Sequence, residues 1–464
     1  MTVPIQADAL RVGMFVHLNV GWMSHPFPLS SFKIASAEQL ETIRGLGLKK
    51  ITWSPDRSDP DPAAMPAPGG AEASAATGAS VADGDAPAGT GAASTDALAQ
   101  QGPGAELAAD AAAAAAFASS PTGPRATARD ALASQRDATA RCERQFTEAC
   151  RDLRRATEKA ATEPTVARDE AQMLARALLD KMLVDGEPCL RVLGETSVDR
   201  ASAHAMNVTV VSLLLARQLD VPRPIMLDLG VGALMHDIGK TVLPDRVRIA
   251  RDDFTHAEQA LYRDHVAEGV AIGRRMGLPA EAQLVIAQHH EYADGSGFPS
   301  GLPLARMSLG ARIVSMVNKY DNLCHGHTPA QSLTPHEALS RMFAQARAKF
   351  DQALLSGFIK MMGIYPPGSV VQLTDDRYAM VMTVNAAHPL KPRVLPYDAA
   401  VPLDDAMHLD LGEHPRLGIR RSLRTEQIPG RVAEYLHPRQ RISYFFDVEP
   451  ERGALADVRE GAVA

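Results

Sequence analysis

The sequence predicts a mainly α-helical protein with a small α+β unit at the N-terminus and a short β-rich tail. Three observations support this fold class. Apolar residues recur at helical spacing through the middle of the chain, strand-like segments flank one helix near the N-terminus, and alternating apolar runs follow Pro366-Pro367. The length of 464 residues, with 45% hydrophobic and 22% charged residues, is typical of a globular protein of several domains.

The first predicted unit covers residues 1–56. A strand-like run over 10–16 precedes a helix that opens near Ser36, and a closing strand follows over 50–53. Because so short a unit buries only a small hydrophobic core, we expect it to pack against another part of the protein.

Residues 57–127 have the composition of a disordered linker. Between positions 61 and 120, 25 of the 60 residues are alanine, and there is no lysine, arginine or isoleucine. Such a segment buries too little apolar surface to offset the chain entropy lost on folding. An interaction tail is the alternative, but a flexible linker explains the composition more simply.

Residues 128–195 read as a charged helical connector. A narrow apolar stripe runs along it at i, i+3, i+4 and i+7. The stripe consists of Phe146, Ala149, Cys150 and Leu153. So narrow a stripe suits pairing with another helix, either within the chain or in a homodimer.

Composition and charge exclude several functions. The net charge is −7, so we expect no polymeric nucleic acid partner. No run of about eighteen uncharged apolar residues is present, and we expect no membrane partner. The N-terminus lacks the layout of a secretory signal, and the four cysteines form no paired framework, so the sequence predicts a cytoplasmic protein.

The arrangement of the fifteen histidines carries the strongest functional signal. His236-Asp237 end an apolar stretch, and we expect Gly239 to stop that helix so that the pair lies at an exposed end. Imidazole and carboxylate together suit Fe, Mn or Zn. His289-His290 close another apolar helix.

Two further histidines lie on predicted helices. His204 lies upstream in a helix rich in valine and leucine, and His265 lies on the helix that opens with the capping box Thr255-x-x-Glu258. Each histidine alone has an ordinary structural explanation, as a packed side chain or a helix cap. Their joint order over fewer than a hundred residues predicts a metal site.

Residues 196–365 resemble an HD-GYP domain, a subgroup of the HD metal-dependent phosphohydrolases that hydrolyse cyclic di-GMP. The resemblance rests on His204, His236-Asp237-Ile-Gly-Lys240, His265, the run from His289 to Pro299, and the helix over 311–321. Residues 7–53 resemble a small domain of unknown function that often precedes HD-GYP domains.

The resemblance implies two divalent metal ions, with Fe or Mn favoured, bridged by Asp237. The implied metal ligands are His204, His236, Asp237, His265, His289, His290 and Asn318. Asp237 and Lys240 would be the catalytic residues, with Lys240 placed to meet a phosphate oxygen. The implied substrate-binding residues are Lys240, Asp294, Gly295, Gly297, Phe298 and Pro299.

The chain departs from the family pattern at three places. Asn318 stands where the family usually has aspartate, so one metal loses a charged ligand. Residues 325–330 contain no arginine where the family usually has an Arg-Pro-Tyr-Arg-like sequence, and Arg200 stands where members with three metals have glutamate. We expect His325 and His327 to be exposed loop histidines.

The leading functional hypothesis is a metal-dependent cyclic di-GMP phosphodiesterase, weakened by Asn318. The alternative is a catalytically degenerate HD-GYP protein that senses a nucleotide or docks a signalling protein. Hydrolysis of another nucleotide is a third possibility, against which the Gly-Phe-Pro loop argues. The predicted domains are 1–56 (α+β), 57–127 (linker), 128–195 (helical connector), 196–365 (HD-GYP-like) and 366–464 (β-rich extension).

Overall fold

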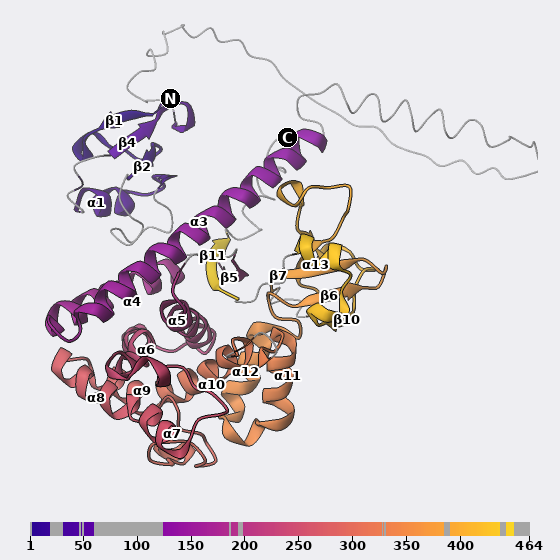
Figure 1. The fold of residues 1–464 in the computed structure, drawn as a ribbon. Helices are drawn as coiled ribbons and strands as arrows, with labels where there is room; N and C mark the ends of the chain where they lie inside the picture. The colour runs from indigo at the N-terminus through magenta and orange to yellow at the C-terminus, as the bar shows by residue number, and fades with distance from the viewer. Residues whose placement is uncertain are drawn as a thin grey trace, which may run out of the picture.

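The structure is a computed structural model that describes residues 2–18, 31–45, 48, 51–59, 124–184, 187–193, 198–326, 328, 331–384, 390–436 and 442–449. It confirms the predicted fold class, with a large helical body, a small N-terminal sheet and a sheet built mainly from C-terminal strands (Figure 1). None of the described helices is both long and apolar enough to cross a membrane. The predicted linker lies almost wholly outside the described residues, which break off at 59 and resume at 124.

The N-terminal unit is a four-stranded antiparallel sheet with one helix. Its elements are β1 (Val3–Ile5), β2 (Phe15–His17), β3 (Ser31–Lys33), α1 (Ala37–Gly45) and β4 (Ile51–Ser54), and the strand order is β1-β4-β2-β3. The strand predicted over 10–16 starts only at Phe15, because Gly13 takes a φ of +89° and turns the chain. Buried Val16 and Ile43 belong to a small core of this unit.

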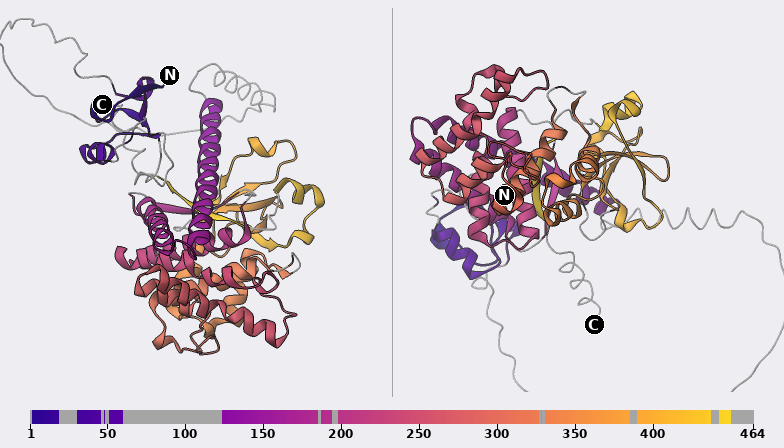
Figure 2. Two further views of the ribbon diagram at one scale, coloured as in Figure 1. Left: turned by 60° about the vertical axis from the view of Figure 1, so that its left-hand side comes forward. Right: turned by 90° about the horizontal axis from the view of Figure 1, so that it is seen from below.

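Helices α3 (Pro124–Lys159) and α4 (Pro164–Met182) pack against each other, and α3 extends beyond the helical body (Figure 2). All four residues of the predicted apolar stripe on α3 are buried in the main hydrophobic core. The ring centroid of Phe146 lies 6.1 Å from that of Phe445, nearly perpendicular to it. Of the two alternatives for the stripe, the structure therefore shows packing within the chain.

The helical body consists of eight further α-helices. They are α5 (Arg200–Gln218), α6 (Arg223–Met235), α7 (His256–Arg263), α8 (His265–Met276), α9 (Ala280–Gln288), α10 (Leu309–Cys324), α11 (Pro335–Gln345) and α12 (Gln352–Met362). Helix α5 is buried on nearly all sides from Ala205 to Ala216, as its valine- and leucine-rich sequence requires. Asp199 caps this helix by accepting a hydrogen bond from the Ser202 amide.

A seven-stranded sheet lies beside the helices. Its strands are β5 (Glu187–Val192), β6 (Val370–Leu373), β7 (Tyr378–Thr383), β8 (Arg393–Pro396), β9 (Leu409–Asp410), β10 (Ile419–Leu423) and β11 (Tyr444–Glu449), with α13 (Gly430–Leu436) before the last strand. Strands β6 and β7 form an antiparallel hairpin from the alternating apolar runs that follow Pro366-Pro367 in the sequence.

The segment 128–195, predicted as a charged helical connector, also contains a strand. Strand β5 lies in this segment and pairs antiparallel with β11 along its whole length, from Glu187 opposite Glu449 to Val192 opposite Tyr444. The partner strand comes from the far end of the sequence, so no local sequence pattern predicts this pairing. Pro188 also argues against a strand at this place.

Candidate metal centre

The ends of four helices bring the predicted ligands together. His236 directly follows α6, His289 directly follows α9, His265 opens α8, and His204 lies in the first turns of α5. Asp237 comes next after His236. The capping box at Thr255 is present, but it opens α7, so His265 begins the following helix rather than lying on the capped one.

The expectation that His236-Asp237 lie at an exposed helix end is wrong. The side chain of His236 is 0% exposed, because the end of α6 is covered by neighbouring helices. Helix α6 also ends before Gly239, at Met235. A Cβ at position 239 would lie 1.9 Å from the backbone oxygen of His265, so this glycine permits close packing rather than stopping the helix.

Four histidines present the same ring nitrogen to the centre. The Nδ1 of His236 donates to the backbone oxygen of Ala233 at 2.8 Å, and His265 and His289 donate in the same way to Tyr262 and Ile286 at 2.5 and 2.8 Å. The Nδ1 of His204 instead donates to Oδ2 of Asp321 at 2.6 Å. These partners accept hydrogen bonds, so they fix the proton on Nδ1 and leave the Nε2 lone pair available.

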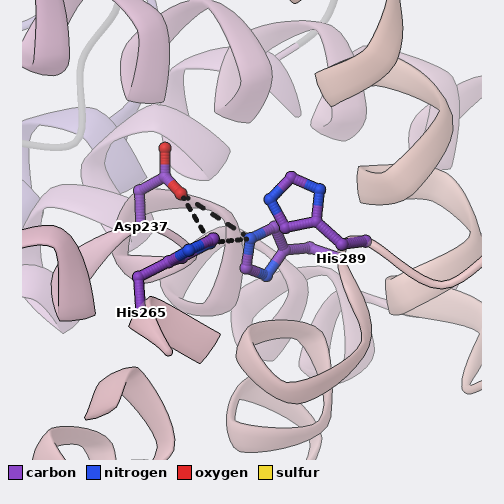
Figure 3. A group of neighbouring side chains, drawn as sticks. Asp237, His265 and His289 are labelled. Atoms are coloured by element: carbon purple, nitrogen blue, oxygen red, sulfur yellow. Dashed lines mark hydrogen bonds and ion pairs between the residues drawn. The ribbon is translucent and has the colours of Figure 1, made fainter. Parts of the chain in front are cut away.

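Asp237 and three histidines form one group of candidate ligands (Figure 3). Oδ1 of Asp237 lies 3.6 Å from Nε2 of both His265 and His289, and these two Nε2 atoms are 3.3 Å apart. His290 completes the group, whose ligand atoms all lie within 4.8 Å of one another.

Asp237 also belongs to a second group, with His204 and His236. Oδ2 of Asp237 lies 3.4 Å from Nε2 of His236 and 3.7 Å from Nε2 of His204, while the two Nε2 atoms are 3.2 Å apart. Each oxygen of one carboxylate thus faces a different pair of imidazoles, which is the arrangement that a bridging ligand requires.

The donor set fits divalent metal ions. Lone pairs on two Nε2 atoms only 3.2–3.3 Å apart repel each other unless a cation lies between them. Oδ1 of Asp237 and Nε2 of His290 are buried and make no hydrogen bond to any described residue. Buried polar atoms are normally satisfied, so these two atoms indicate a missing ligand, and nitrogen and oxygen donors suit first-row metals.

The electrostatics keep the imidazoles neutral and the carboxylate charged. Burial lowers the pKa of His265 to about 3 and also lowers the pKa of His204, His289 and His290. Burial alone would raise the pKa of Asp237, but Lys240 and His236 outweigh it and hold that pKa well below its usual range. These are the protonation states that bind metal.

Lys240 lies directly beside the shared carboxylate. Its Nζ donates to Oδ2 of Asp237 at 2.6 Å and lies 5.4 Å from the centroid of the Tyr262 ring. Asp237 raises the pKa of Lys240 against the effect of burial, so the ammonium stays charged. Sequence analysis identified Lys240 as a site residue but did not identify Tyr262, whose ring lies beside its ammonium group.

Helix α10 forms the wall next to the His204 group. Asn318 is buried, and its Oδ1 accepts a hydrogen bond from Nδ2 of Asn322 at 2.6 Å. Asp321, one turn further along, holds His204 through Oδ2 and accepts from Nδ2 of Asn207 at 2.9 Å through Oδ1. Sequence reasoning missed the role of Asp321, although its spacing of three from Asn318 places both residues on one helix face.

The expectation that His325 is exposed is wrong. Its side chain is only 12% exposed, because the ring links α10 to the segment before β11. Nδ1 lies 2.8 Å from the backbone oxygen of Asp321, and Nε2 accepts from the amide of Ile442 at 3.0 Å. Asp321 raises the pKa of His325 although burial opposes it. His327 lies outside the described residues.

The loop after His290 is organised by a buried carboxylate. Glu291 is 0% exposed, and it accepts hydrogen bonds from the amides of Ser300 and Leu302 at 2.7 and 2.9 Å. A Cβ at Gly297 would lie 2.4 Å from the Tyr292 amide, so glycine is needed for the loop to pack on its own backbone. This contact within the chain explains Gly297 without a ligand.

A cavity of about 1230 Å³ adjoins both ligand groups. Six of the predicted site residues line it, namely His204, Asp237, Lys240, His289, His290 and Asn318. The predicted substrate-binding residues Asp294, Gly295, Gly297, Phe298 and Pro299, all within the described part of the chain, are not among its lining residues. Phe298 does border the centre, since its ring stacks on His290 with centroids 4.4 Å apart.

Comparisons with known proteins agree with this geometry. Residues 188–354 match the HD domain family, and residues 2–171 match a domain of unknown function, DUF3391. The DUF3391 match thus extends well beyond the 7–53 that the sequence resemblance covered.

Several curated relatives match the same region. A cyclic di-GMP phosphodiesterase of Pseudomonas aeruginosa is 33% identical over 226 residues, which cover 47% of this chain and 53% of that protein. The cyclic di-GMP phosphodiesterase response regulator RpfG of Xanthomonas campestris is 28% identical over 161 residues, which cover 34% and 43%. The chain spans about half the length of the curated relatives it matches.

A solved HDG"Y"P protein from Bdellovibrio bacteriovorus is 16% identical and covers 77% of this chain and 98% of its own, with a TM-score of 0.38 that is too low to support an inference. Residues 188–354 thus match an HD domain, and the cluster of histidines with Asp237 in this region fits a site for divalent metal. The two matched families and the cyclic di-GMP phosphodiesterases among the relatives support the resemblance to an HD-GYP phosphohydrolase preceded by a DUF3391 domain.

Proposed function

We propose that the protein is a cyclic di-GMP phosphodiesterase that cleaves a phosphodiester bond at a site for two divalent metal ions. The observation that carries the proposal is the sharing of Asp237 between two groups of ligand atoms. One group adds His204 and His236, with Asn318 beside it, and the other adds His265, His289 and His290. We favour Fe or Mn, because the donors are imidazole and carboxylate without thiolate.

The proposed reaction needs both bound metal ions and side chains of the protein. The five histidines and Asp237 would hold two divalent ions, which would acidify a water molecule and neutralise charge on the phosphate oxygens. Asp237 offers one oxygen to each group, and the protonated Nδ1 atoms keep the imidazoles correctly oriented. Lys240 supplies a permanent positive charge beside Asp237, where it would meet a phosphate oxygen of the substrate.

The loop from Asp294 to Pro299 is proposed to approach the substrate from the His290 side. Stacking of Phe298 on His290 supports this placement. Because the loop does not line the cavity, we propose that it positions His290 as well as contacting the nucleotide.

A degenerate signalling protein is the second candidate. The observation in its favour is the neutral Asn318, whose Oδ1 is already engaged by Asn322. Such a protein would bind cyclic di-GMP or a signalling partner without turnover. A cytoplasmic location and a homodimer also remain proposals, the first supported by four free cysteines in the structure.

The proposal is tested with protein purified anaerobically and loaded with Fe or Mn. Loss of cyclic di-GMP and metal content are measured for the unmodified protein, for Asp237→Ala and for His256→Ala, which removes an exposed imidazole on α7 as a control. The proposal predicts turnover in the unmodified protein and the control, and none in Asp237→Ala. Binding of cyclic di-GMP without turnover by the fully loaded protein would favour the signalling candidate instead.

A further inference from the structure

The cavity is larger than a metal centre needs. Pockets for whole small ligands usually measure about 300–1,000 Å³, and this one measures about 1230 Å³. Besides the metal groups, its walls include Lys319 of α10 and Arg341 of α11. The walls of this space therefore include cationic side chains beside acidic ones such as Asp252.

Most cations in the walls already have partners. The guanidinium of Arg154 pairs with Glu158 at 2.8 Å, and Lys240 pairs with Asp237 at 2.6 Å. Arg200 donates to the backbone oxygen of His325 at 2.7 Å. Each of these side chains thus has an ion-pair or hydrogen-bond partner within the protein.

Lys319 and Arg341 differ from them. Neither side chain makes a hydrogen bond or an ion pair with any residue that the structure describes. Lys319 is half-buried, and Arg341 and Lys349 are close enough to repel its charge. Asp252 attracts Lys319, but its Oδ2 already accepts a hydrogen bond from Gln331 at 2.9 Å. Two cations thus line the same cavity, and Arg341 repels the charge of Lys319.

We propose that Lys319 and Arg341 form a phosphate subsite for the non-reacting phosphate of a cyclic dinucleotide. This inference rests on the proposed function, because a cyclic dinucleotide carries two phosphates and the metal groups engage only one. Charge-assisted hydrogen bonds from lysine and arginine are strong phosphate contacts.

The polar surface of α10 supports the same placement. Ser315, Asn318 and Asn322 line the cavity from the same helix as Lys319. Their hydroxyl and amide groups suit the sugar and base of a nucleotide, so α10 would contact the substrate from the metal groups to Lys319.

The test compares two double variants with the same change in net charge. Lys319→Gln with Arg341→Gln removes the subsite, whereas Lys360→Gln with Arg431→Gln removes exposed cations on α12 and α13 that do not line the cavity. Binding of cyclic di-GMP to the metal-loaded proteins is measured by calorimetry at several salt concentrations, together with metal content.

We expect the subsite variant to bind cyclic di-GMP about ten-fold or more weakly than the control, with a shallower salt dependence and unchanged metal content. Lys319→Arg, which keeps the charge, should retain most of the affinity. If the double variant does not fold, Arg341→Gln alone serves, because Arg341 is exposed, and it should weaken binding about three-fold.

Affinity within two-fold of the control, in a protein that still binds or hydrolyses cyclic di-GMP, would overturn the subsite and leave the proposed function intact. An unmodified, metal-loaded protein that neither binds nor hydrolyses cyclic di-GMP would overturn both.

Discussion

The two groups of candidate ligands share Asp237 but are built differently. In the group with His265 and His289, backbone oxygens hold both Nδ1 atoms, so helix ends of the fold itself orient the rings. In the group with His204, a backbone oxygen likewise holds Nδ1 of His236, but the Nδ1 proton of His204 is held by the side chain of Asp321 on α10. The first group is therefore supported by backbone, and the second depends on how α10 is placed.

The two groups also differ in what they offer a cation. His290 adds a third imidazole to the His265 group, and its Nε2 is buried without a hydrogen bond to any described residue. The other group adds only two imidazoles to Asp237, and Asn318, which lines the same cavity, is a neutral amide whose Oδ1 accepts from Asn322. The comparison teaches that one carboxylate can face two unequal donor sets, with three imidazoles on one side and two on the other.

Removal of the shared ligand should have the largest effect. We expect Asp237→Ala to lose both metal ions and all phosphodiesterase activity, because each group depends on one of its two oxygens. Elemental analysis of the purified variant measures this directly. Full metal content in Asp237→Ala would show that the ligand assignment is wrong.

A change at Gly239 should damage one group more than the other. A Cβ there would clash with the backbone of His265 and Gly269, so Gly239→Ala should displace His265 and lower the affinity of that site at least ten-fold. The other group should keep more of its affinity. Gly430→Ala is the matched control, since nothing lies within 4 Å of the added Cβ. Equal losses of metal affinity at both sites would contradict the view that the two groups are supported independently.

Restoring a carboxylate should strengthen the weaker group. We expect Asn318→Asp to tighten metal binding at the His204 site about ten-fold, with no change at the other site, because an anionic oxygen replaces a neutral one. Hydrolysis of cyclic di-GMP should rise with occupancy. Gln345→Glu, which adds the same charge at an exposed position on α11, serves as the control. Unchanged metal affinity in Asn318→Asp would show that Asn318 is not a metal ligand.

The smallest expected effect concerns pH in the metal-free protein. The folded-state pKa of His265 is about 3, whereas its ordinary value is 6.5, so between these values the unfolded chain binds a proton that the folded protein does not. The free energy of unfolding should therefore fall as pH falls from 6.5 toward 3. Urea unfolding of chelated His265→Asn should show about 2 kcal/mol less loss between pH 7 and pH 5 than the unmodified protein. Parallel curves would mean that His265 does not stay neutral.

Much of the fold could be predicted from sequence because its signals are local. Helical periodicity indicated the helices of the central body, and the alternating apolar runs indicated the strands β6 and β7. Strand β5 could not be predicted, since its pairing with β11 joins opposite ends of the chain and its own sequence contains Pro188. A strand whose stability comes from a distant partner leaves no periodic signal.

In the candidate site, too, local features could be predicted and long-range contacts could not. The order of the histidines and Asp237 indicated the ligands, and the structure brings all of them together. Their burial was not predicted, because whether the end of α6 is covered depends on the packing of other helices. The roles of Asp321 and His325 were missed for the same reason, as each depends on contacts with α5 or with the segment before β11.

The most direct test of the central claim is a calorimetric titration of chelated protein with Mn²⁺ under anaerobic conditions. The shared carboxylate and the unequal groups predict two binding events, a tight one that is lost in His265→Ala and a weaker one that is lost in His204→Ala. A single binding event, or two events that both disappear in either variant to the same extent, would contradict a two-metal centre bridged by Asp237.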